Sequence, residues 1–189
     1  MQNFISEGFS YYPEFISEEE ENSLLIQLKR LNWQKIVMYK QTAKRKVVHF
    51  GFNYSYSNRK IEPTIPPPAF LYPLINRCAI LLKVEPEELA EVLITEYPLG
   101  AQIGWHRDAA VFDTIVGISL GSACTIKFRQ KMNALDNHFT AILEPRSAYI
   151  LANSIREEWE HTIPPVKNVR YSITLRTLKT KDKEWEGRK

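Results

Sequence analysis

The sequence contains no apolar run close to the roughly 20 residues that a membrane-spanning helix needs. Residues 1–10 lack a basic segment followed by a long apolar stretch, so no secretory signal is expected. There are only two cysteines, Cys78 and Cys124, both in apolar surroundings and outside any Cys-x-x-Cys spacing. We therefore expect buried free thiols in a cytoplasmic protein that has no membrane partner.

An excess of charge of one sign is also missing, because the formal net charge is only +3. The charges are unevenly distributed, with an acidic cluster at Glu18–Glu21 and basic clusters at Lys40–Lys46, Arg59–Lys60 and the alternating Lys127, Arg129 and Lys131. Basic residues with aromatic residues between them could follow a phosphate backbone. An ordinary solvated surface is the alternative interpretation of the same charges.

Internal repeats, low-complexity tracts and linkers are absent from the 189 residues, 44% of which are hydrophobic. This predicts a single globular domain, expected as a monomer, in two parts. Residues 1–91 are expected to pack on a core formed by residues 92–180.

The first part is predicted to be partly helical. Ser17 begins a Ser-Glu-Glu-Glu run that has the form of a capping box, and leucines at helical spacing follow it. The predicted elements are a helix over Ser17–Leu31, a strand over Trp33–Tyr39, an aromatic strand pair or ordered loop over Val47–Tyr56, an extended loop over Pro63–Pro68 and a helix over Ala69–Lys83. The aromatic side chains of Val47–Tyr56 either fill a core or face a partner.

The second part lacks helical periodicity and consists of short predicted strands. They are Val92–Tyr97, Ile103–Asp108, Ile115–Leu120, Cys124–Arg129, His138–Leu143, Ser147–Leu151 and Arg170–Leu178. Short strands separated by turn signals predict a sandwich, a barrel or a jelly roll.

A candidate metal site begins at His106-Arg107-Asp108. On a strand, alternate side chains share a face, so His106 and Asp108 would point the same way. Among four histidines, His49 is expected to be structural, whereas His161 is the attractive third ligand. Two histidines and one carboxylate suit non-haem Fe(II), and a tetrahedral Zn site is the competing interpretation.

The predicted last strand indicates an anion. Arg170, Ser172, Thr174 and Arg176 alternate with Tyr171, Ile173 and Leu175. Two arginines that face into a barrel are unfavourable unless an anion pairs with them, and a guanidinium binds a carboxylate through two hydrogen bonds. A metal together with a small carboxylate co-substrate answers both features; a solvent-facing strand is the alternative.

The ordered set of residues resembles the AlkB family of Fe(II)- and 2-oxoglutarate-dependent dioxygenases. That family has His-x-Asp, a distant His, and then Arg-x-Asn-x-Thr-x-Arg. Here these are His106-Arg107-Asp108, His161 and the strand from Arg170 to Arg176. Ser119-Leu120-Gly121 and the segment Thr95–Gly100 are similar to two further family segments. The resemblance covers Val47–Leu178 and implies a mainly β, α+β double-stranded β-helix with an N-terminal helical support.

The resemblance also implies roles for individual residues. His106, Asp108 and His161 would bind Fe(II), and Arg170, Tyr97 and Ser172 would hold the distal carboxylate of 2-oxoglutarate. Arg176 and Thr95 would lie near its iron-chelating end. The segment Val47–Tyr56, together with the proline loop, is similar to a nucleotide-recognition lid. Candidate substrate contacts are Tyr54, Tyr56, Arg59 and Trp105.

The implied activity is oxidative demethylation of an alkylated DNA or RNA base, with O2 as second co-substrate and with formaldehyde, succinate and CO2 as products. The substrate would be single-stranded or would have a flipped base. Three departures stand out: Thr95 and Ser172 replace Asn, and Ala110 stands where repair members often have an acidic residue. The alternatives are an oxygenase that hydroxylates or demethylates a protein, lipid or small molecule, and a non-catalytic jelly-roll binding module.

Overall fold

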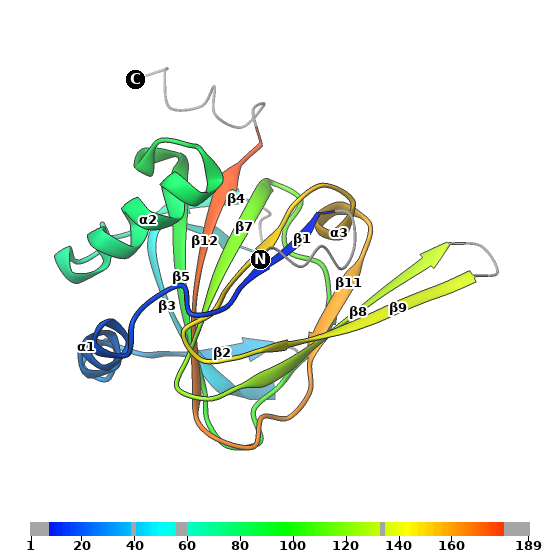
Figure 1. The fold of residues 1–189 in the computed structure, drawn as a ribbon, viewed down its shortest axis with the longest axis horizontal. Helices are drawn as coiled ribbons and strands as arrows, with labels where there is room; N and C mark the ends of the chain where they lie inside the picture. Colours follow the sequence, from blue (N-terminus) through cyan, green and yellow to red (C-terminus); the bar gives the residue numbers. More distant parts are fainter. Residues whose placement is uncertain (1–7, 39–40, 56–59, 133–134, 180–189) are drawn as a thin grey trace.

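The computed structural model describes residues 8–38, 41–55, 60–132 and 135–179, which form two antiparallel sheets that face each other (Figure 1). The large sheet runs in the spatial order β1 (Phe9–Tyr12), β10 (Ala148–Leu151), β7 (Phe112–Leu120), β12 (Arg170–Leu178), β5 (Leu89–Tyr97), β3 (Gln41–Ser55) and β2 (Gln34–Met38), and β4 (Lys60–Pro63) pairs with the end of β3. The small sheet runs β6 (Ile103–His106), β11 (Glu160–Ile163), β8 (Cys124–Met132) and β9 (Leu135–Leu143). This is the two-sheet jelly roll that the sequence predicts.

Two helices, α1 (Glu18–Leu28) and α2 (Tyr72–Leu82), lie on the side of the large sheet away from the small sheet (Figure 1, left). Short helices precede and follow α2, namely the 3-10 turns η1 (Ala69–Leu71) and η2 (Pro86–Glu88), and α3 (Asn153–Glu157) precedes β11. No helix in the described part of the chain is long and apolar enough to cross a membrane.

The start of α1 confirms the predicted capping box. The Glu20 amide donates to Ser17 Oγ at 3.2 Å, and the Ser17 amide donates to Glu20 Oε2 at 2.8 Å. Glu20 also accepts two hydrogen bonds from the Arg77 guanidinium, at 2.6 and 2.9 Å, which ties α1 to α2. The helix therefore begins where predicted, although it ends at Leu28 rather than Leu31.

Strand β12 lies in the middle of the large sheet and pairs with β5 on one side and β7 on the other. Tyr171, Ile173 and Leu175 pack into the core beneath the helices. Because side chains alternate along a strand, Arg170, Ser172, Thr174 and Arg176 point towards the small sheet. The predicted alternation is confirmed, and it turns two arginines into the space between the sheets.

Several elements differ from the predictions. The predicted strand Ile103–Asp108 ends at His106, and the structure adds β1, β4, β11 and α3, none of which the sequence patterns indicate. Each added element is five residues or shorter. A segment of this length carries too few residues to show a period, so its structure depends on its neighbours in space. Tyr39 and Tyr56, at the ends of two predicted strands, lie outside the described residues.

Both cysteines are buried free thiols, as predicted. Burial raises the pKa of the Cys78 thiol to about 12, and burial also raises that of Cys124. At pH 8 the thiolate fraction of Cys78 is then lower than that of an ordinary cysteine by a factor on the order of a thousand. We expect peptide mapping after brief iodoacetamide treatment to find Cys78 unlabelled in folded protein and labelled in denatured protein. Rapid labelling of the folded protein would contradict its burial.

Candidate active site

The two histidines of the predicted site lie opposite each other on neighbouring strands. His106 on β6 and His161 on β11 are register partners, and their ring centroids are 4.3 Å apart. The Nδ1 atom of His106 lies 2.9 Å from the Gly104 carbonyl oxygen, which can only accept. Nδ1 therefore carries the proton, and Nε2 keeps the lone pair that a metal needs.

Asp108 joins the two histidines from the loop after β6, and not from a strand as predicted. One metal-ligating atom from each of His106, Asp108 and His161 lies within 4.8 Å of the others. Asp108 Oδ2 is 3.5 Å from His161 Nε2, whereas Oδ1 accepts a hydrogen bond from Arg176 Nη2 at 2.9 Å. The three groups converge as predicted, although a turn rather than strand alternation places the carboxylate.

The loop that carries Asp108 is held by Arg156 from α3. This buried guanidinium donates from Nη2 to the carbonyl oxygens of Ala109 and Phe112, and the latter distance is 2.8 Å. The Phe112 amide also donates to the Ala109 carbonyl at 3.1 Å, which closes a turn. Arg156 was not anticipated from the sequence, because a lone arginine in a five-residue helix gives no signal.

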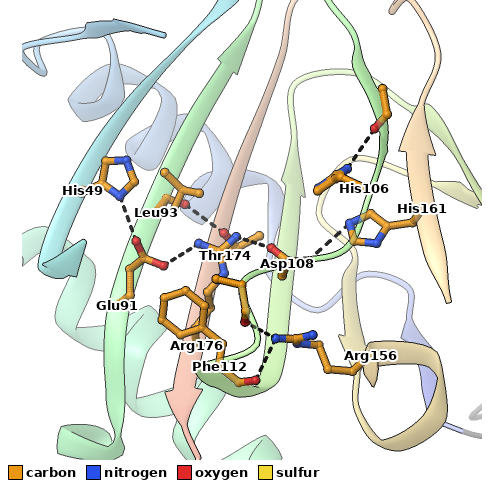
Figure 2. A network of polar contacts seen from close by, with 12 residues as sticks. His49, Glu91, Leu93, His106, Asp108, Phe112, Arg156, His161, Thr174 and Arg176 are labelled. Carbon is orange, nitrogen blue, oxygen red and sulfur yellow. Dashed lines mark hydrogen bonds and ion pairs between the residues drawn. The ribbon is translucent and has the colours of Figure 1, made fainter. Parts of the chain in front are cut away.

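Arg176 links Asp108 to a second carboxylate (Figure 2). Its Nη1 donates to Glu91 Oε2 at 2.5 Å, and the other oxygen, Glu91 Oε1, lies 2.8 Å from His49 Nδ1. The side chains come from β12, β5 and β3 respectively, which are adjacent in the large sheet. The result is a chain of polar contacts from His49 on β3 to Asp108 beside the two histidines.

Electrostatics give the site the protonation states that a metal requires. Burial alone would raise the pKa of the Asp108 carboxyl, but Arg176 and the other cationic groups outweigh it and hold that pKa well below its ordinary value. Burial lowers the pKa of His161 to about 4, although Asp108 acts in the opposite direction. At neutral pH the site therefore offers a carboxylate and a neutral imidazole, which are the metal-binding forms.

The remaining predicted cofactor residues lie together on β12 and β5. Arg170 is the register partner of Tyr97, and Ser172 is the partner of Thr95, and all four side chains are buried. Arg170 Nε donates to Ser119 Oγ at 3.1 Å, and its guanidinium carbon lies 5.1 Å from the Tyr97 ring centroid. Its two remaining nitrogens have no hydrogen-bond partner among the described residues. A buried cation with two unpaired donors fits a carboxylate ligand.

The predicted substrate residues are not all brought to the site. The Tyr54 ring on β3 packs edge-on against Phe112, the first residue of β7 after the Asp108 loop, with centroids 6.4 Å apart. Trp105 is on the other face of β6 from His106, and Arg129 lies 4.3 Å above its ring. Tyr56 and Arg59 lie outside the described residues. The geometry thus packs Tyr54 against residues just after Asp108, namely Ala109 and Phe112, and turns Trp105 to the face of β6 opposite His106.

Two histidines and one carboxylate held between the sheets of a jelly roll are the arrangement typical of non-haem Fe(II) oxygenases. The comparisons with known proteins agree with this class. The family model described as the 2OG-Fe(II) oxygenase superfamily matches residues 8–176. The chain belongs to this superfamily, with AlkB-like homologues, and is an oxygenase that depends on Fe(II) and 2-oxoglutarate.

Three curated relatives have similar sequences. The uncharacterized protein L905 of Acanthamoeba polyphaga mimivirus is 28% identical, over 90% of this chain and 85% of its own. The alkylated DNA repair protein ALKBH8 homolog of Arabidopsis thaliana is 26% identical, over 83% and 51%. The tRNA (carboxymethyluridine(34)-5-O)-methyltransferase alkbh8 of Xenopus tropicalis is 27% identical, over 85% and 26%. The chain thus spans about half the length of the Arabidopsis relative and about a quarter of the length of the Xenopus relative.

Among solved structures, that of OsALKBH1 superposes with a TM-score of 0.68 at 13% identity and covers 94% of this chain and all of that one. At this identity the likeness is evidence for the fold. It confirms the jelly roll with two antiparallel sheets.

Proposed function

We propose that this oxygenase removes an alkyl group from a nucleic-acid base by oxidation. The observation that carries the proposal is the contact of Tyr54 on β3 with Phe112, the first residue of β7 directly after the Asp108 loop. Strand β3 carries the partly exposed rings of Phe52 and Tyr54, whereas Phe50 is buried in the core, and it carries the basic residues Lys44 to Lys46. Aromatic rings that stack on bases and cations that pair with phosphates are the usual means of binding single strands. The relatives named for alkylated DNA repair and for tRNA modification support the same substrate class.

The residues of the site would then have the following roles. His106, Asp108 and His161 would hold Fe(II), which together with 2-oxoglutarate and O2 supplies the oxidising chemistry. Arg170 would bind the distal carboxylate of 2-oxoglutarate, with Tyr97 and Ser172 beside it. Thr95 and Arg176 would lie at the other end of the co-substrate, where Arg176 also orients Asp108. Ser172 and Thr95 would bond through hydroxyls, directly or through water, where the family has amides.

Oxygen and electrons balance for removal of a methyl group. Oxidative decarboxylation converts 2-oxoglutarate to succinate and CO2 and places one oxygen atom of O2 in succinate. The other oxygen atom converts the N-methyl group to N-hydroxymethyl. The N–C bond then breaks, the nitrogen takes the hydroxyl proton, and formaldehyde leaves.

A second candidate uses the same centre on a protein, lipid or small molecule. Ala110 is the observation that favours it, because this exposed methyl side chain follows Asp108 by two residues and cannot accept a hydrogen bond from the exocyclic amine of a base. The two candidate functions share the same oxidation chemistry and differ in the class of substrate that binds at the entrance of the site.

A panel of methylated oligonucleotides separates the two candidates. We expect formaldehyde release from single-stranded RNA or DNA that carries N1-methyladenine, N3-methylcytosine or an N-methylated pyrimidine, with the unmethylated strands as controls. Turnover should fall steeply as salt is raised, because phosphate contacts release counterions. If 2-oxoglutarate is converted to succinate but no methylated strand, tRNA included, yields formaldehyde, then the nucleic-acid proposal is wrong and the second candidate remains.

A further inference from the structure

Glu91 is a buried carboxylate on the face of β5 that turns towards the candidate metal ligands, away from the core beneath the helices. It shares this face of β5 with Leu93 and Thr95, and only 1% of its surface is exposed. Transfer of a carboxylate out of water is strongly unfavourable unless charges and hydrogen bonds compensate it. Both oxygens are compensated here, one by Arg176 and the other by His49. A compensated buried charge that packing does not require is an indication of a role in the site.

The geometry of Arg176 suggests what that role is. The guanidinium uses Nη1 for Glu91 and Nη2 for Asp108, so it is held between two carboxylates. Because a guanidinium is planar, fixing one arm fixes the direction of the other. Glu91 thereby aims Nη2 at Asp108 Oδ1 and keeps Asp108 Oδ2 turned to His161. Without Glu91, Arg176 could take both oxygens of Asp108 in a two-point pair and so compete with a metal.

The negative charge of Glu91 also favours metal binding. Arg176 is a permanent cation beside a set of ligands that binds a divalent cation, so it opposes the binding of the metal. The carboxylate of Glu91 offsets this positive charge from the far side of the guanidinium. Burial alone would raise the pKa of Glu91, but Arg176 and His49 lower it overall, so the offsetting charge is present at neutral pH.

His49 completes the set from the neighbouring strand β3. Its Nδ1 contacts the Glu91 oxygen that Arg176 does not use, and its side chain is 22% exposed. His49 therefore contacts Glu91, which is linked to the candidate metal ligands through Arg176, whereas the sequence predicted only a structural role for it.

We propose that Glu91 is a positioning residue of the metal centre, which sets metal affinity by orienting and neutralising Arg176, and that His49 fixes the Glu91 carboxylate. The proposal rests on the family's iron centre and not on the identity of the substrate. It therefore holds for either candidate in the proposed function.

The test is a titration of metal-free protein with Mn²⁺ under anaerobic conditions, without substrate, followed by calorimetry. We expect Glu91→Gln to weaken binding by about 10- to 100-fold, the range found when partners of metal ligands are replaced. The matched control is Glu96→Gln, which removes the same charge from the opposite face of β5, where Glu96 pairs with Lys46 at 3.0 Å. That control should bind Mn²⁺ like the parent protein.

His49→Phe provides the second variant, which is expected to fold because the side chain is partly exposed. It should weaken Mn²⁺ binding by about tenfold alone and by no further amount in the Glu91→Gln background, because the two residues act through one contact chain. A merely structural role would lower the melting temperature and leave the affinity of the folded protein unchanged. Parent-like affinity in Glu91→Gln overturns the proposal, and if that variant does not fold, parent-like affinity in His49→Phe does so.

Discussion

Replacing His106 with alanine is expected to reduce the conversion of 2-oxoglutarate to succinate by more than about 100-fold, since even partners of metal ligands account for up to that factor. His106 lies opposite His161 in the small sheet, and its Nδ1 is already committed to the Gly104 carbonyl. Only Nε2 can therefore bind the metal, and alanine leaves the site with two protein ligands. The measurement is succinate formation with saturating Fe(II), together with the iron content of the purified protein.

The matched control is His138→Ala, on the exposed face of β9 in the same sheet. It removes the same ring without touching the three converging ligands, and turnover should remain. The melting temperature of the metal-free His106→Ala protein should stay close to that of the parent, because His106 is only partly buried. Parent-like turnover in His106→Ala would show that the metal assignment is wrong.

Much of the fold can be predicted because its longer elements carry a period. Strand β12 alternates over nine residues, and α1 combines a capping box with leucines at helical spacing. The short elements β11 and α3 carry no such signal, although β11 supplies His161. Strand β11 forms because it fits between β6 and β8, pairing with both. Such pairing is a property of the assembled sheet and cannot be seen in four residues.

The candidate site, like the fold, has one part that the sequence predicts and another part that it does not. His106 and Asp108 are close in sequence, and the ordered motif that continues to Arg176 identifies the ligands. Sequence spacing gives the right residues but the wrong local geometry, because Arg156 bends the chain after β6 into a turn. Glu91 is 85 residues from Arg176 and 42 from His49. Contacts between residues so far apart depend on strand order, which no single motif encodes.

Three buried arginines surround the site, and their partners distinguish their roles. Arg156 donates hydrogen bonds to backbone carbonyl oxygens, and Arg176 forms ion pairs with two carboxylates. Arg170 is completely buried, yet it has no carboxylate partner among the described residues: Nε donates to Ser119 and the Tyr97 ring lies beside the guanidinium, while Nη1 and Nη2 face no acceptor that satisfies them. A charge that is uncompensated within the protein is unfavourable until an anion pairs with it. Arg170 is therefore the arginine that should matter for binding 2-oxoglutarate rather than for folding.

Replacing Arg170 with methionine is accordingly expected to have effects of opposite sign on binding and stability. The KM for 2-oxoglutarate should rise about 150- to 5,000-fold, since loss of one partner of a buried, hydrogen-bonded ion pair costs about 3–5 kcal/mol. The melting temperature of the metal-free protein should stay the same or increase, because methionine fills the space without an unpaired charge. Arg77→Met is the control, because Arg77 pairs with Glu20 at 2.6 Å between the helices, so this change should lower stability and leave KM unchanged. An Arg170→Met protein that melts earlier and keeps the parent KM would make Arg170 a structural residue and would remove the proposed carboxylate clamp.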